Sequence, residues 1–128
     1  MTPSQQLAEA LKPDGLAETT FGPLEDYRPV EGWKADAGKA RMDLLPPEFL
    51  TSTAAILAFG AAKYGERNWE KGLKWSRAFA ALERHMWAWW AGEKADAETG
   101  KSHLWHASCC LAFLIAYEAR GTGEDDRP

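Results

Sequence analysis

Cysteine and long apolar runs are both scarce in this sequence of 128 residues. The only two cysteines, Cys109 and Cys110, are adjacent in an apolar helical pattern, where a disulfide between them would be badly strained. We interpret them as reduced thiols of the core. No stretch approaches the roughly 18 to 20 apolar residues of a membrane span, and the N-terminus lacks the basic start and apolar segment of a secretory signal. These absences predict a cytoplasmic protein with no membrane partner.

The sequence also lacks an excess of basic charge. Its net charge is −4, spread along the chain, which argues against the broad basic surface of a general nucleic-acid binder. A small anionic ligand held by a local basic cluster is still compatible with this balance. Tryptophan, by contrast, is abundant, with seven residues that need packing partners. We place Trp75 and Trp87 in the core, together with Phe113 and Leu114.

Apolar residues recur at helical spacing in three segments, at about 47–64, 76–91 and 102–120. A further short helix is predicted from Ser4 to Lys12, followed by a stretch that prolines and glycines break up to residue 33. No segment alternates as a strand would. We therefore expect an all-α fold, a compact helical bundle of about four helices with an irregular N-terminal arm. The arm would occupy residues 1–37, the helical domain 38–120, and a frayed polar tail 121–128.

Histidines and carboxylates gather around the connection between the last two predicted helices. His103 and His106 lie three residues apart and share a helix face, while His85 lies near the end of the preceding helix. Acidic residues of the connection add oxygen donors, at Glu93, Asp96 and Glu98. Helix bundles build divalent-metal sites in this way, with carboxylates accepting Mg²⁺ or Mn²⁺ and imidazoles adding affinity for Mn²⁺, Co²⁺ or Zn²⁺. The alternatives are partly buried histidines of the core and a solvated acidic turn.

Basic residues cluster in the stretch "KYGERNWEKG", which offers Lys63, Arg67 and Lys71 together with Asn68. Such groups can bind phosphate oxygens, and Tyr64 or Trp69 could stack on a base. The glycine-lysine-serine ending of a Walker A loop is absent. A second basic segment contains Lys34, Lys39 and Arg41. The alternative interpretations are a helix connection with solvated basic side chains and a linker with scattered charges.

Several blocks of the sequence, in this order and spacing, resemble one protein family. The blocks are "GKARMDLLPPE", "FGAAKYGERNWEKG", "WSR", "RHMWAWWAGEKADAETGKSHLWHA" and "FLIAYE". They resemble the dATP/dGTP diphosphohydrolase N-terminal domain of phages and prophages, from about Gly38 to Glu118. The resemblance implies conversion of a purine deoxynucleoside triphosphate to the monophosphate and pyrophosphate with a divalent cation, in the host cytoplasm. The ExxE and ExxD carboxylate pairs of the MazG-type pyrophosphohydrolases, to which this label suggests kinship, are absent.

The resemblance, taken residue by residue, predicts a site. Its metal ligands would be His85, Glu93, Asp96, His103 and His106. Its catalytic residues would be Asp96, favoured as general base, with Glu93 and His103. The substrate, a purine nucleotide or a related phosphorylated molecule, would contact Lys39, Arg41, Lys63, Arg67, Asn68 and Lys71, with Trp69 stacking on the base.

Two other functions stay open at this point. One is a nucleotide-binding protein that sequesters its ligand without turnover, which explains the missing carboxylate pairs. The other is a structural or interaction protein. We also expect a homo-oligomer, because short helices that expose many aromatic residues rarely leave a large apolar patch in water.

Overall fold

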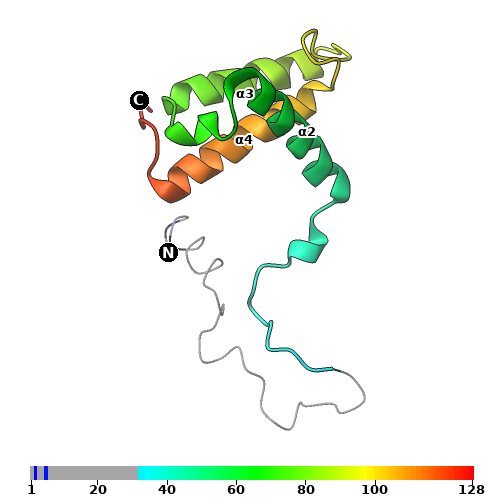
Figure 1. The fold of residues 1–128 in the computed structure, drawn as a ribbon, viewed down its shortest axis with the longest axis vertical. Helices are drawn as coiled ribbons and strands as arrows, with labels where there is room; N and C mark the ends of the chain where they lie inside the picture. Colours follow the sequence, from blue (N-terminus) through cyan, green and yellow to red (C-terminus); the bar gives the residue numbers. More distant parts are fainter. Residues whose placement is uncertain (1, 3–4, 6–31) are drawn as a thin grey trace. The chain divides into compact units, whose positions relative to one another are not determined.

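The computed structural model describes residues 2, 5 and 32–128 (Figure 1). The chain divides into two units, Met1–Leu44 and Leu45–Pro128. In the described part of the first unit, a turn around residues 37–39 precedes a short 3₁₀ helix, η3, at Met42–Leu44. The helix predicted from Ser4 to Lys12 falls on residues of which only Gln5 is described.

The second unit contains the helices α2 (Pro47–Tyr64), α3 (Trp75–Trp90) and α4 (His103–Arg120), with a short 3₁₀ helix, η4 (Asn68–Lys71), between α2 and α3. The described residues include no strand, apart from a single bridge between Lys74 and Glu124. The predicted all-α class is thus confirmed. The described residues form three α-helices rather than four, and each lies within one residue of its predicted bounds.

Local sequence explains where the helices begin and end. Pro46 and Pro47 start α2, because a proline at the first helical position has no amide hydrogen to leave unbonded. The Ser102 hydroxyl caps α4 by accepting a hydrogen bond from the amide of Leu104 at 3.2 Å. Gly121 ends α4 with a φ of 65°, a left-handed conformation that favours glycine.

Helix α4 is the centre of the second unit, because α2 and α3 both pack against it (Figure 1). A hydrogen bond between Thr53 and Ser108 joins α2 to α4. The largest fully buried side chain is Tyr117 of α4, whose hydroxyl donates to the carbonyl oxygen of Trp69 at 2.5 Å. Among the residues that the structure describes, the buried apolar core is small and consists of Ile56, Ala78, Ala107, Cys109 and Tyr117.

The residues after α4 return to the start of α3. The indole nitrogen of Trp75 donates to the carbonyl oxygen of Thr122 at 2.9 Å, and the amide of Ser76 donates to a carboxylate oxygen of Asp126 at 2.9 Å. The polar tail, which was predicted to fray, thus supplies a cap for the first turn of α3.

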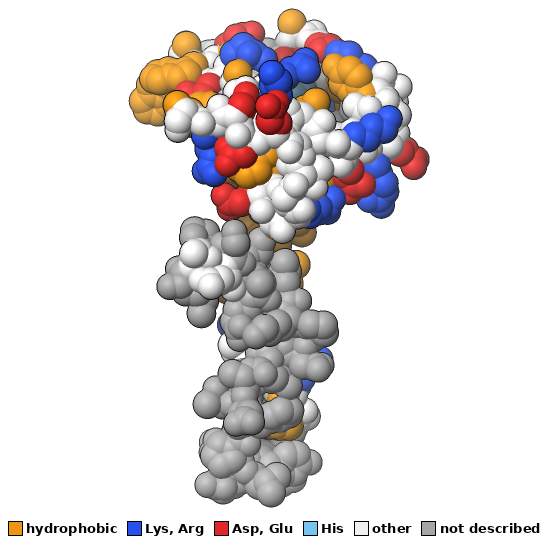
Figure 2. All heavy atoms as spheres, turned by 90° about the vertical axis from the view of Figure 1, so that its left-hand side faces the viewer, with side chains coloured by type: hydrophobic (Ala, Val, Ile, Leu, Met, Phe, Trp, Pro, Cys, Tyr) orange, Lys and Arg blue, Asp and Glu red, His pale blue; other side chains and the backbone are white. Residues whose placement is uncertain are grey.

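Many large apolar side chains are exposed on the helices, among charged ones (Figure 2). The placement of Trp87 in the core was wrong, because its side chain is 64% exposed and its indole donates to Glu83 of the same helix. Around the axis of α3, Trp87 lies about 200° from His85, and His85 packs toward α4. Trp87 therefore points away from α4. None of the helices in the described ranges is both long and apolar enough to cross a membrane.

Candidate cation site and the adjoining cleft

Three potential metal ligands converge where α3 ends and α4 begins. His85 comes from the second half of α3, His103 is the first residue of α4, and Asp96 lies in the connection between them. One donor atom of each lies within 4.8 Å of the other two. The Nδ1 atoms of His85 and His103 are 2.9 Å apart, so they either share a proton or can flank one cation.

His103 is buried, with 5% of its surface exposed, and its Nε2 atom has no hydrogen-bond partner. The carboxylate of Glu93 lies 3.4 Å from this atom but outside hydrogen-bonding geometry. A buried polar atom without a partner costs about 1–3 kcal/mol. Two imidazoles and a carboxylate are ligands that suit divalent Mn²⁺, Co²⁺ or Zn²⁺, so the residues present fit a cation.

Hydrogen bonds inside the connection fix the position of Asp96. Its Oδ1 atom accepts from the amides of Glu98 and Thr99 at 2.9 and 3.1 Å, and its own amide donates to the carbonyl oxygen of Lys101 at 2.8 Å. Burial raises the pKa of Asp96, but the amides of Thr99 and Glu98 lower it more, so the net pKa is below its ordinary value. The carboxylate is therefore charged beside the histidines at neutral pH.

His106 lies beside this cluster, with its Nε2 atom 3.7 Å from a carboxylate oxygen of Asp96, and its role as a further metal ligand stays a prediction. Its ring stacks on His85, with centroids 4.6 Å apart, and its Nε2 atom is 2.7 Å from the Thr99 hydroxyl. Burial lowers the pKa of His106. The pKa of His85 is also lowered, mainly by burial and to a smaller extent by the charge of His106. Both rings are thus neutral at pH 7 and keep a lone pair for a proton or a metal.

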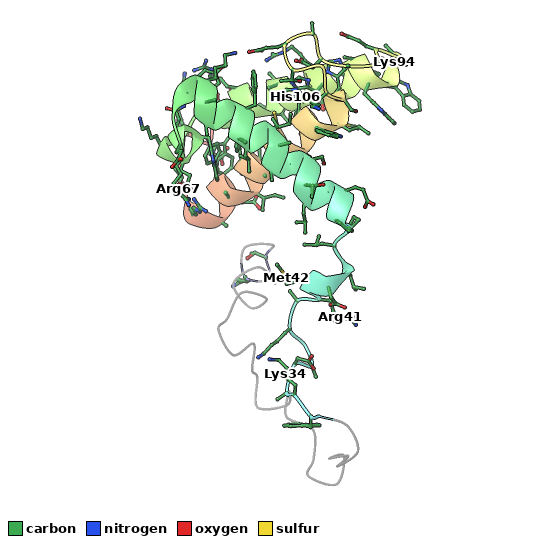
Figure 3. All side chains as sticks on the ribbon, turned by 45° about the vertical axis from the view of Figure 1, so that its right-hand side comes forward. Lys34, Arg41, Met42, Arg67, Lys94 and His106 are labelled. Atoms are coloured by element: carbon green, nitrogen blue, oxygen red, sulfur yellow. The ribbon has the colours of Figure 1, made fainter. Side chains whose placement is uncertain are left out.

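An open cleft of about 870 Å³ begins at His106. Residues of α2 form one wall, residues of α3 form the other, and α4 contributes the floor. Figure 3 shows His106 on α4 near the connection that carries Lys94, and Arg67 near the opposite end of the second unit. The cations that line the cleft are Lys63, Arg67, Arg77 and Arg84, and its anions are Glu66 and Glu98. The candidate cation site thus adjoins a cavity with basic walls.

The four cations of the cleft differ in their partners. Lys63 forms an ion pair with Glu98 at 2.5 Å, and Arg67 forms one with Glu70 at 3.2 Å. Arg77 and Arg84 make no ion pair with any other described residue. Sequence reasoning missed both arginines. The available signal was their spacing of seven, which places them on one helix face.

Trp69, predicted to stack on a base, packs within the protein. Its ring stacks on Phe113 with centroids 4.8 Å apart, and the guanidinium of Arg120 lies 5.6 Å from its centroid. Tyr64 also lines the cleft and is 62% exposed. Asn68 lines the cleft, whereas Lys71 is exposed and does not belong to its lining. The base-stacking role of Trp69 stays a prediction.

The other two predicted phosphate contacts, Lys39 and Arg41, belong to the first unit. Arg41 donates two hydrogen bonds of 2.8 Å to the carboxylate of Asp43, and the amide of Lys39 donates to the carbonyl oxygen of Asp36. Their part in ligand binding stays a prediction.

Comparison with known proteins supports the resemblance seen in the sequence. A family model described as "dATP/dGTP diphosphohydrolase, N-terminal" matches residues 29–127. A protein of Salmonella phage PMBT28 named dATP/dGTP diphosphohydrolase is 38% identical over 98 residues, which cover 77% of this chain and 33% of that protein. The chain therefore spans about a third of the length of this relative. No solved structure matches the present chain.

Proposed function

The chain belongs to the dATP/dGTP diphosphohydrolase N-terminal family, and we propose that it hydrolyses purine deoxynucleoside triphosphates to the monophosphate and pyrophosphate. One observation carries this proposal, the convergence of His85, Asp96 and His103 at the end of a cleft with basic walls. The name of the phage relative supports the substrate class, dATP or dGTP.

The ligands of the cation would be His85, Asp96 and His103, with Mn²⁺ favoured and Mg²⁺, Co²⁺ or Zn²⁺ as alternatives. The bound cation would neutralise phosphate charge and make a water molecule more acidic. The lowered pKa of Asp96 suits a ligand better than a general base. Glu93, 3.4 Å from His103, would orient that imidazole from outside the ligand set.

The neutral imidazole of His106 is the group best placed to accept a proton, because it lines the cleft and stacks on His85. In the proposed reaction, a water oxygen attacks the α-phosphorus while the bond from that phosphorus to the bridging β-phosphate oxygen breaks. Pyrophosphate leaves, and His106 takes the proton of the water. Lys63 would leave its ion pair with Glu98 and bind a phosphate oxygen of the ligand instead. Arg67 would do the same with its ion pair to Glu70.

The test is a product assay on the purified chain with dATP or dGTP and each of the four cations. We expect release of pyrophosphate that requires a cation and disappears in Asp96→Asn. The matched control is Glu118→Gln, an exposed carboxylate on α4 outside the cleft, which should keep the activity. Tight binding of nucleotide without product under any cation would overturn the hydrolase and favour sequestration, a function that needs no catalytic carboxylate pair.

We further propose that the chain forms a homo-oligomer through the side of α3 and α4 opposite the cleft. Exposed apolar residues recur there at helical spacing, namely Phe79, Met86 and Trp90 on α3 and Leu104, Leu111 and Ile115 on α4. Phe79 and Trp90, which are 54% and 74% exposed, have the most surface left to bury, and the six side chains together can supply part of the roughly 800 Å² per partner of a stable interface. A second copy would present the same stripe, as a two-fold interface requires.

Sedimentation analysis tests this interface. Trp90→Glu should shift the protein toward the monomer, whereas Leu50→Glu, at an exposed apolar position on α2, should not. A wild-type chain that sediments as a monomer at high micromolar concentration would contradict the proposal.

A further inference from the structure

We propose that Arg77 and Arg84 form a binding site for the phosphate chain of the nucleotide along the α3 wall of the cleft. This inference rests on the proposed function for the identity of its ligand, a polyphosphate ester. Both side chains come from one face of α3, because seven residues correspond to nearly two helical turns. They are therefore about 10 Å apart along the helix axis.

The pairing of the other arginines distinguishes these two. Each remaining described arginine pairs with a carboxylate, Arg41 with Asp43, Arg67 and Arg120 with Glu70, and Arg127 with Asp125. Arg77 and Arg84 have no such partner within the described ranges, although both line a cavity. A guanidinium offers a planar fork of donors that matches phosphate oxygens, so two unpaired forks on one wall fit a chain of phosphates.

Small residues keep the space between the two arginines open. Ala81 lies between them on the α3 wall and contributes only a methyl group. Gly60 lines the α2 wall, and a Cβ atom built there would meet no other atom within 4 Å.

Arg84 connects the phosphate site to the candidate cation site. It directly precedes His85 in the chain and lines the cleft together with His106, whose ring stacks on His85. Burial raises the pKa of the Cys110 thiol, and the charge of Arg84 opposes that rise, as expected for a guanidinium above the α4 floor. Phosphates held by Arg84 would therefore lie next to the cation ligands, and those held by Arg77 further along the cleft.

The experiment compares Arg77→Gln, Arg84→Gln and a control, Arg127→Gln, which removes the same charge from a paired residue of the tail outside the cleft. Binding is measured by calorimetry in EDTA, where no turnover occurs, with three probes: dGTP, inorganic tripolyphosphate and deoxyguanosine. Each cleft variant should weaken dGTP and tripolyphosphate binding about ten- to a hundredfold and leave deoxyguanosine unchanged, because one charge-assisted contact is lost. The control should stay within about twofold, and unfolding temperatures should confirm that all variants fold.

The outcomes separate this proposal from the hydrolase. If the wild type releases no pyrophosphate with any cation but the arginine variants lose tripolyphosphate binding, the hydrolase fails and the phosphate site stands. If the wild type hydrolyses dGTP while both variants keep its KM and the affinity for tripolyphosphate, the phosphate site is wrong and the hydrolase stands. A wild type that binds neither dGTP nor tripolyphosphate would also overturn the phosphate site.

Discussion

Replacing His103 by leucine should remove the response to a cation without destabilising the metal-free protein. His103 is buried and its Nε2 atom lacks a partner, which costs about 1–3 kcal/mol. Leucine removes that cost but also removes the hydrogen bond to His85, which contributes about 1 kcal/mol. The net change is between about zero and 2 kcal/mol of stabilisation.

Thermal unfolding in EDTA and in MnCl₂ measures both effects. For a unit of this size, about 1 kcal/mol shifts Tm by roughly 4–8 °C, so metal-free His103→Leu should unfold between the wild-type temperature and roughly 16 °C above it. Wild-type protein at a hundred times the Kd for Mn²⁺ gains about 2.7 kcal/mol, or roughly 10–20 °C. The leucine variant should gain almost nothing.

The matched control is His106→Leu, which removes an imidazole whose Nε2 atom does have a partner, the Thr99 hydroxyl. This variant should lose about 1 kcal/mol in EDTA, because a hydrogen bond disappears and no orphaned atom is relieved. If His103→Leu is instead the more damaging of the two in EDTA, or still responds to Mn²⁺, then His103 is an ordinary core residue and the cation site is wrong.

Three further predictions test other parts of the structure. Gly123→Ala should lower Tm more than Gly92→Ala: both have positive φ, but only at residue 123 would the new Cβ overlap a main-chain carbonyl oxygen. Burial lowers the pKa of His85 and of His106. The Tm of the metal-free protein should therefore be constant above about pH 6.5 and fall as the pH drops through the lowered pKa values, because the unfolded chain then binds more protons than the folded one. Replacing both histidines by asparagine should flatten that profile. Burial raises the pKa of the Cys109 thiol to about 12. In the variant Cys110→Ser, the Cys109 thiol should therefore react with a disulfide reagent at pH 8 only as fast as the protein unfolds. Rapid labelling of the folded protein would contradict the burial of Cys109.

The helices were predictable because their signals are local. Apolar spacing gave the three segments, and Pro47, Ser102 and Gly121 gave boundaries correct to within one residue. The approach of His85 to His103 was also predictable, since a short connection makes two helices antiparallel neighbours. The acidic connection between them brought Asp96 to the same end of the unit.

The basic wall was harder to predict because it depends on tertiary structure. Arg77 and Arg84 look like ordinary solvated residues of an amphipathic helix until α2 packs on α4 and closes the other side of the cleft. Lys63 looks like a free cation in the sequence, yet its partner Glu98 lies 35 residues away. Trp87 was misplaced because tryptophans usually need packing partners, whereas Trp87, Trp89 and Trp90 at the end of α3 are all exposed.

The small core gives the candidate cation site a second consequence, for stability. The buried apolar side chains of the second unit lie on α2, α3 and α4, whereas the connection 91–102 is held mainly by hydrogen bonds around Asp96. A cation bound by His85, Asp96 and His103 would join α3, this connection and α4 at one point. Binding that occurs only in the folded state stabilises it by mass action, so the cation that serves the reaction would also stabilise the end of the bundle where the cleft begins.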